Sequence, residues 1–488
     1  MSEHTLRAGV SRVDITPPVP IDLLGYSRRW KPATEVRAPL TVTALVLEDG
    51  GTGAVMISVD AVGLSPAYAT TIRELAARAA GVPTEHVMLN ESHSHATPCT
   101  PGRLKIGGRQ REFSPIEQEY GRYLPQQVAA AARLAAGRLE PVRVGSGTGS
   151  VDLAVNRRER VEGGARGTVG IVKTILGWNP DGPCDRDVGV LRVDRLDGAP
   201  MAIVVNFSCH PVVVGPEDPA INPDFPGPMR DMVERITGAT CLFLQGAAGN
   251  VLPLEAFFPT PGPEVAFGER LALEALRVAA GIQTFDSRIE REGYGSVTPI
   301  SLYRRVRVSP QPPQTLAVAS EVVEFPLKPI PTKEQIESER ARHLAQLEDA
   351  RRAGATQDVL NPIEYHVNWA DDALRQLRET GPYQSVPAFL QAFRIGDTAV
   401  IAVPGEPFSE ISLAIKARSP AGAGHTLFAG YSNGIISYLP SAAEYAYGGY
   451  EVDYAHHSAG LLEQVASETE AIIVGTHARL LARLFPCA

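Results

Sequence analysis

The 488-residue chain lacks several features that would assign it to a class of protein at once. Its five cysteines are scattered at positions 99, 184, 209, 241 and 487 without a Cys-x-x-Cys pair, which excludes a zinc ribbon and a disulfide framework. It has no dense run of Lys and Arg, and its formal net charge is −9. The sequence therefore predicts no nucleic-acid partner.

Long apolar segments are missing as well. The first residues, MSEHTLRAGVSRVD, contain no apolar signal-peptide core, and no stretch approaches the ~20 residues of a membrane span. No internal repeat or low-complexity tract stands out. We therefore expect a cytoplasmic protein without a stable membrane anchor. The sequence leaves its oligomeric state open.

Apolar runs alternate with helical patterns over the first 300 residues. Residues 40–49 and 54–63 have the pattern of strands, and residues 66–81 follow as an amphipathic helix that ends at Gly81. Such alternation is typical of an α/β fold, here with mixed β-sheets and flanking helices.

The sequence changes in character from about residue 303. Proline-rich stretches precede a charged helical segment at 332–354, and the α/β pattern returns near residue 390. We predict a single domain over residues 1–488, with residues 303–385 as an inserted helical segment or subdomain.

Three predicted strands end in residues that can bind a metal. His93 and His95 follow the apolar run 86–90, His210 ends another run, and Glu406 follows a third. In open α/β sheets, functional groups gather beyond the carboxyl ends of strands, and imidazole and carboxylate groups suit catalytic zinc. A single strand-end histidine, however, is more often a hydrogen-bonded structural group.

The other histidines are expected outside this arrangement. His456 and His457 are adjacent, and we expect them to cap a helix or to face solvent. The others lie at positions 4, 86, 343, 366, 425 and 477.

Several ordered segments resemble the neutral/alkaline ceramidase family. They are RAGVSRVDITPP with LLGYS near the start, VMLNESHSHATP at 87–98, VNFSCHP at 205–211, AVPGEP at 402–407 and SNGIISYLPSAAEYAYGGYE at 432–451. The resemblance covers most of residues 7–300 and 390–455. It implies a ceramidase-like catalytic domain.

The resemblance also implies roles for individual residues. It makes His93, His210, Glu406 and Tyr438 the ligands of a catalytic zinc ion. His95 becomes a proton-transfer residue, which fits an extended segment because residues two apart then share a face. Arg157 would polarise the substrate carbonyl. From the sequence alone, Tyr438 would be a buried aromatic residue and Arg157 an exposed member of a charged run.

Two departures from the family bear on the substrate. The family has Gly-Asp-Val-Ser-Pro where this chain has Gly-Asn-Val-Leu-Pro, so Asn250 replaces the acid and Leu252 replaces a serine implicated in ceramide hydrolysis. The family also carries a C-terminal immunoglobulin-like domain that does not follow here. Both argue against a lipid-facing ceramidase.

These observations predict a zinc-dependent hydrolase that cleaves an amide (N-acyl) bond of a small soluble substrate by attack of metal-activated water. An esterase or lactonase using the same zinc site and a ceramidase are the alternatives. A hydrolase with a nucleophilic serine would have to use Ser208, Ser409 or Ser432, which are weak candidates. A non-catalytic binding protein that keeps the fold also stays open.

Overall fold

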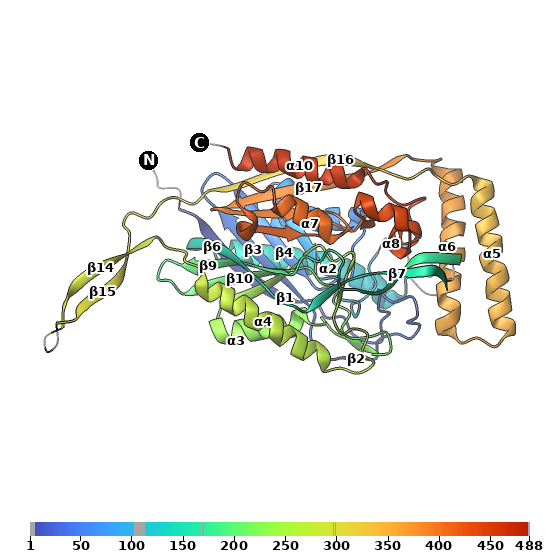
Figure 1. Ribbon diagram of the computed structural model, residues 1–488, viewed down its shortest axis with the longest axis horizontal. Coiled ribbons are helices and arrows are strands. Elements are labelled where there is room, and N and C mark those ends of the chain that lie inside the picture. Colours follow the sequence, from blue (N-terminus) through green and yellow to red (C-terminus); the bar gives the residue numbers. More distant parts are fainter. Residues whose placement is uncertain (1–4, 102–112, 168–169, 296, 298, 487–488) are drawn as a thin grey trace.

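The computed structural model describes residues 5–101, 113–167, 170–295, 297 and 299–486. Two β-sheets pack face to face, and helices cover their outer faces, so the body has the layer order helix, sheet, sheet, helix (Figure 1). The prediction of an α/β fold with mixed sheets and flanking helices is confirmed.

The larger sheet has eight strands in the order β12-β10-β9-β6-β1-β3-β4-β5. Most neighbours are antiparallel, but β10 with β12 and β4 with β5 are parallel, so the sheet is mixed. In sequence order the strands are β1 (Arg7–Asp14), β3 (Thr41–Glu48), β4 (Gly53–Val59), β5 (Val87–Glu91), β6 (Glu140–Ser150), β9 (Asp187–Arg195), β10 (Pro200–Phe207) and β12 (Thr240–Gln245).

The smaller sheet has four strands in the order β16-β17-β18-β20, namely Leu316–Pro326, Ser385–Ile395, Thr398–Ala402 and Thr426–Ala429. Its inner face meets the larger sheet in one buried core. Leu45, Met88 and Leu242 belong to the larger sheet in this core, and Phe393 and Leu427 to the smaller.

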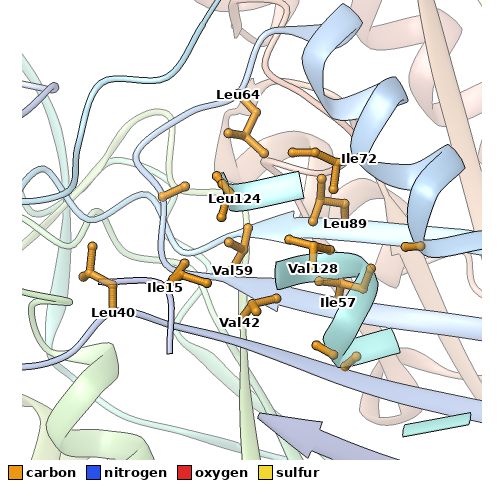
Figure 2. Close-up of a cluster of buried hydrophobic side chains, with 14 of the residues drawn as sticks. Ile15, Leu40, Val42, Ile57, Val59, Leu64, Ile72, Leu89, Leu124 and Val128 are labelled. Atoms are coloured by element: carbon orange, nitrogen blue, oxygen red, sulfur yellow. The ribbon is translucent and has the colours of Figure 1, made fainter. Parts of the chain in front are cut away.

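Helices close both outer faces. The amphipathic α1 (Pro66–Ala80) and α2 (Pro115–Ala136) cover β1, β3, β4 and β5, and Figure 2 shows their core, in which Ile72 and Leu124 meet Ile57 and Leu89. The helix α1 ends as predicted, because Gly81 adopts the left-handed conformation that suits a helix C-terminus. The others are α3 (Pro226–Thr237) and α4 (Pro263–Gly281) on the larger sheet, and α7 (Ser409–Lys416) and α10 (Thr469–Leu484) on the smaller.

Two buried asparagines bring distant strand ends together. Asn90 at the end of β5 accepts a 2.8 Å hydrogen bond from Gln245 N of β12 and donates one of 2.6 Å to Gly430 O beyond β20. Asn206 of β10 donates to Leu244 O and exchanges two hydrogen bonds with the backbone of Phe428. Because buried amides must be satisfied, these contacts fix the ends of the two sheets against each other.

Further elements surround this body. The three-stranded sheet β13-β7-β8 consists of Val251–Pro253, Ala154–Gly167 and Gly170–Asn179, and the ribbon β14 (Ser287–Tyr294) with β15 (Ser301–Arg307) projects from the body (Figure 1). The short pairs are β2 (Glu35–Val36) with β11 (Ala220–Ile221) and β19 (Glu406–Pro407) with β21 (Tyr438–Leu439).

The predicted segment 303–385 contains most of β15, the strand β16 and a hairpin of two long helices. The helices α5 (Lys333–Arg352) and α6 (Gln357–Glu379) stand side by side at one end of the molecule (Figure 1). Whether the segment is an insertion stays a prediction. Among the described residues, no helix is long and apolar enough to cross a membrane.

Candidate metal centre and its pocket

His93 lies just beyond β5, and one backbone carbonyl group holds its ring. Its Nδ1 contacts Val62 O and its backbone N donates to Ala61 O at 2.9 Å. A carbonyl oxygen can only accept, so Nδ1 carries the proton and the lone pair of the ring is on Nε2. His93 has φ +66°, so the segment turns here and the predicted extended conformation from His93 to His95 is wrong.

His210 follows β10 and is held in the same way. Its Nδ1 donates to Ala248 O at 2.6 Å and lies 3.1 Å from Val251 O, so its lone pair is also on Nε2. Burial lowers the pKa of His210 well below its ordinary value, and the charge of Arg157 lowers it further. The ring is therefore neutral at pH 7 and can act as a ligand.

Glu406 of β19 closes the arrangement. Its Oε2 lies 3.4 Å from Nε2 of both His93 and His210. The tight loop before β13 helps to place it, because the position of a Cβ on Gly249 would be 2.3 Å from Glu406 O. The structure therefore brings together two histidines and one carboxylate that follow three different strands.

Tyr431 was missed by the sequence reasoning. Its ring lies 4.4 Å from that of His93 and its hydroxyl donates to Glu406 Oε2 at 3.4 Å. Burial raises the pKa of Tyr431 well above its ordinary value, and Glu406 adds to this shift, so the phenol stays protonated. The residue has φ +49°, and nothing in its sequence pattern marked it.

His95 faces the pocket beside these groups. Its Nε2 lies 3.2 Å from Nε2 of His93, while its buried Nδ1 has no hydrogen-bond partner among the described residues. Desolvation lowers the pKa of His95 well below its ordinary value, and His93 reinforces the shift. The ring packs directly on Gly25, where a Cβ would lie 2.5 Å from Cγ of His95.

Arg157 of β7 is buried. The interpretation from sequence alone, an exposed member of a charged run, is therefore wrong. Its Nε donates to Glu451 Oε1 at 2.8 Å and its Nη1 lies 3.5 Å from His210 Nε2. Glu451 also accepts a 2.6 Å bond from Arg158. The buried Nη2 of Arg157 has no hydrogen-bond partner within the described part of the chain.

Tyr438 of β21 is the register partner of Glu406 in β19. Its ring stacks parallel to that of His210 at 6.5 Å between centroids, and the guanidinium of Arg157 lies 5.4 Å from its centre. Burial raises the pKa of Tyr438 well above its ordinary value, with Glu406 as the next cause. The structure thus places Tyr438 beside the cluster with a protonated hydroxyl.

The donor set fits a metal ion. His93, His95 and His210 each offer a ring nitrogen, and these atoms all lie within 4.8 Å of one another. Metal-binding histidines commonly direct their second nitrogen to a carbonyl or carboxylate, as His93 and His210 do. The cluster could therefore hold a metal ion, with Glu406 as an anionic ligand.

The cluster opens into a pocket of about 310 Å³. Leu252, which stands where the resembled family has serine, is one of its walls, so this wall offers no hydroxyl group. The pocket is lined by Gly25, Tyr26, Ser27, His95, Arg157, Leu176, His210, Val212, Leu252, Phe257, Pro362, Tyr365, His366, Tyr438, Tyr450 and Tyr454.

His366 lies outside the metal-binding set, as expected, but it lines the same pocket. The expectation that His456 and His457 face solvent is wrong. His456 and His457 form the first turn of α9 (His456–Ala459), which follows α8 (Tyr450–Asp453), and both are buried instead of facing solvent. Their burial comes from α6, whose Trp369 stacks on His457 at 3.8 Å. The sequence analysis did not predict this burial, because it did not predict α6.

The candidate serines do not form a nucleophilic pair with histidine. The segment Gly430–Gly434 also fits the Gly-x-Ser-x-Gly pattern, which adds to the case for Ser432 considered above. Its buried hydroxyl, however, donates to the carbonyl groups of Ala429 and Gly430 and accepts from Asn90. Ser208 and Ser409 likewise bond to backbone groups. These hydroxyl groups are therefore engaged in hydrogen bonds with backbone groups.

Fold and site together define an α/β protein of the neutral ceramidase fold with a buried histidine cluster able to hold a metal ion. In sequence the chain is 25% identical over 485 residues to the neutral ceramidase of Pseudomonas aeruginosa, a match that covers 91% of this chain and 68% of that protein. No protein-family model matches.

Several solved structures share the fold. A crystal structure of neutral ceramidase from Pseudomonas aeruginosa matches 99% of this chain and 75% of its own with a TM-score of 0.66 and 20% identity. A structure described as ceramidase complexed with C2 matches 98% of this chain and 75% of its own with a TM-score of 0.67 and 20% identity. The resemblance to the ceramidase family indicated by the motifs is confirmed.

Proposed function

We propose that this protein is a zinc-dependent hydrolase that cleaves an amide (N-acyl) bond of a small soluble substrate. The observation that carries the proposal is the convergence of His93, His210 and Glu406, with both imidazoles oriented by backbone carbonyl groups. Homology to a ceramidase supports an amide as the bond that is cleaved.

His93, His210 and Glu406 would hold the zinc ion, with Tyr438 as the fourth ligand. When bound, zinc supplies Lewis acidity, which lowers the pKa of water toward ~7 and polarises a carbonyl group. The metal-binding nitrogens must be unprotonated, and the backbone contacts of Nδ1 enforce that state in both histidines.

His95 is assigned to proton transfer. The Nδ1 atoms of His93 and His210 are fixed to carbonyl groups, whereas Nδ1 of His95 is not, so this ring lacks the anchoring of the other two. A neutral imidazole in the pocket can take a proton from the attacking water and return it to the leaving amine.

Arg157 is assigned to the substrate carbonyl. Its Nε is held by Glu451, and Arg157 lines the pocket. A fixed cationic donor stabilises negative charge that develops on the carbonyl oxygen. Among the lining residues, the proposal thus gives roles to His95, Arg157, His210 and Tyr438.

Activity profiling of the metal-loaded protein tests the reaction class. We expect the highest kcat/KM on small N-acyl amides and a much lower value on ceramide, because Leu252 replaces the serine hydroxyl of the family. Esters and lactones of matched size are the second class to test, since the same groups would serve them. Turnover of ceramide equal to that of the best small amide would contradict the substrate assignment. Zinc binding without turnover would favour a binding protein.

His210→Ala is expected to lose most of its bound metal and its activity, because a three- or four-ligand site then has too few ligands. Elemental analysis of the purified variant measures this. His425→Ala is the matched control, since His425 is exposed and bonds to Ser146 away from the cluster. Normal metal content in His210→Ala would show that His210 is not a ligand.

A further inference from the structure

The helix α6 is a wall of the pocket. Pro362, Tyr365 and His366 from this helix line the same cavity as His95 and His210. None of the three belongs to the motifs that indicated the metal site. The helix therefore contributes to the space in which a substrate would lie without contributing a predicted ligand.

This wall is anchored on both sides of the cavity. On one side, Asp358 pairs with Arg28 at 3.1 Å, and Asn361 donates to Arg29 O at 3.4 Å. The chain just before these arginines, at Gly25 and Tyr26, also lines the cavity.

On the other side, α6 is joined to α9. Trp369 stacks on His457 at 3.8 Å and donates to Leu461 O at 2.8 Å. His366 is fixed between the helices, with its Nδ1 3.0 Å from Nδ1 of His457 and its ring stacked on His343 of α5. Contacts of this kind hold the wall in one position, so the width of the cavity is built into the fold.

Apart from the guanidinium of Arg157, the described lining of the cavity carries no charged side chain. No carboxylate is among its described lining residues, and the one guanidinium, that of Arg157, shares the carboxylate of Glu451 with Arg158. Burial lowers the pKa of His366 to about 3, with His343 as a second cause, so the ring carries no charge at pH 7. The remaining lining is mostly aromatic or aliphatic.

We propose that α6 sets substrate choice by admitting one compact, uncharged, largely apolar group beside the reacting bond. At ~30 Å³ for each water-sized group, the cavity of about 310 Å³ holds about ten non-hydrogen atoms. A longer chain would extend out of the cavity and gain no further contact. This inference depends on the proposed function only for the identity of the bond that is cleaved.

Binding of linear methyl ketones, from propanone to 2-undecanone, tests this without any reaction, because they carry a carbonyl group but no bond to hydrolyse. Calorimetry on the full-length protein should show Kd falling by about fourfold with each methylene, the fold-change that matches ~0.8 kcal/mol per buried CH₂. The gain should stop once the cavity is full, at roughly eight to ten carbons. Alkylammonium ions of the same length should bind more weakly, because the lining offers them no carboxylate among the described residues.

Tyr365→Ala should move this limit to longer chains, because it removes a ring from the wall. Tyr303→Ala is the matched control, since Tyr303 is exposed on the projecting ribbon. If Tyr365→Ala fails to fold, Tyr365→Leu removes part of the same ring.

An affinity that keeps rising to the longest ketone would overturn the proposal. So would an unchanged limit in the folded Tyr365 variant, tighter binding of the alkylammonium ions, or no binding at any length. Failure of the proposed function would instead appear as absent amide turnover in the activity panel, which does not affect the ketone readout.

Discussion

The His93→Ala variant is expected to lose bound metal and activity together, whereas His95→Ala should keep its metal and lose a hundredfold to ten-thousandfold in rate. The difference follows from their surroundings. His93 has Nδ1 on Val62 O and Nε2 3.4 Å from Glu406, the setting of a ligand. His95 has an unbonded Nδ1 in the described structure, and ~10²–10⁴ is the usual contribution of a positioned general base. Elemental analysis and steady-state kinetics on both variants measure the two effects.

A second variant perturbs His95 without removing its imidazole ring. Gly25→Ala should also reduce the rate while metal stays bound, because the new Cβ would lie 2.5 Å from the His95 ring and must displace it. Gly163→Ala is the control, since Gly163 has a similarly positive φ but nothing within 4 Å of the added atom. If His95→Ala loses metal as completely as His93→Ala, His95 is a ligand and the base must be sought elsewhere, with Glu91 as the nearest candidate.

Arg230→Ala is expected to lower the free energy of unfolding by about 3–5 kcal/mol, the usual cost of removing one partner of a buried ion pair. Both Asp60 and Arg230 are buried, and the guanidinium donates to the carboxylate in two bonds of 2.9 and 2.7 Å. The variant leaves Asp60 charged and without this partner in the interior. Denaturant unfolding of both proteins, compared at the same slope m, gives the difference in the free energy of unfolding.

The control for this prediction is an exposed pair. Arg352→Ala breaks a contact with Asp349, in which both side chains are more than 70% exposed, and should cost less than about 1 kcal/mol. Asp60→Asn combined with Arg230→Met should recover part of the loss, because no unpaired charge then remains. Equal stability of Arg230→Ala and the native protein would show that the buried pair contributes nothing. The stability of this ion pair also concerns the site. Asp60 directly precedes Ala61 and Val62, whose carbonyl groups accept hydrogen bonds from His93.

The sequence predicted the elements that present the site because their patterns are local. The strands β5, β10 and β18 appeared as apolar runs, and His93, His210 and Glu406 follow them in the structure. Local patterns also ended α1 at Gly81. The convergence of these strand ends is different, since it depends on buried contacts such as those of Asn90 with β12 and Gly430. The rule that functional groups gather at strand ends indicated it in general terms, and the family resemblance implied the ligand set.

Other features were beyond local reasoning for identifiable reasons. The helix α6 carries Pro362 in its interior, a residue that normally argues against a helix, so the wall of the pocket was not foreseen. The turn at His93 requires a positive φ that histidine seldom adopts, and contacts to Ala61 and Val62 stabilise it. Tyr431 reaches Glu406 only through tertiary packing.

The most direct test of the account is to follow amide hydrolysis while metal is removed and restored. The purified protein is stripped with a chelator, its metal content is measured, and zinc is added back in known amounts. We expect activity to fall with the metal content and to return in proportion to added zinc up to about one equivalent, as for a single three- or four-ligand site. Full hydrolysis of a small amide by protein that contains no transition metal would contradict the account.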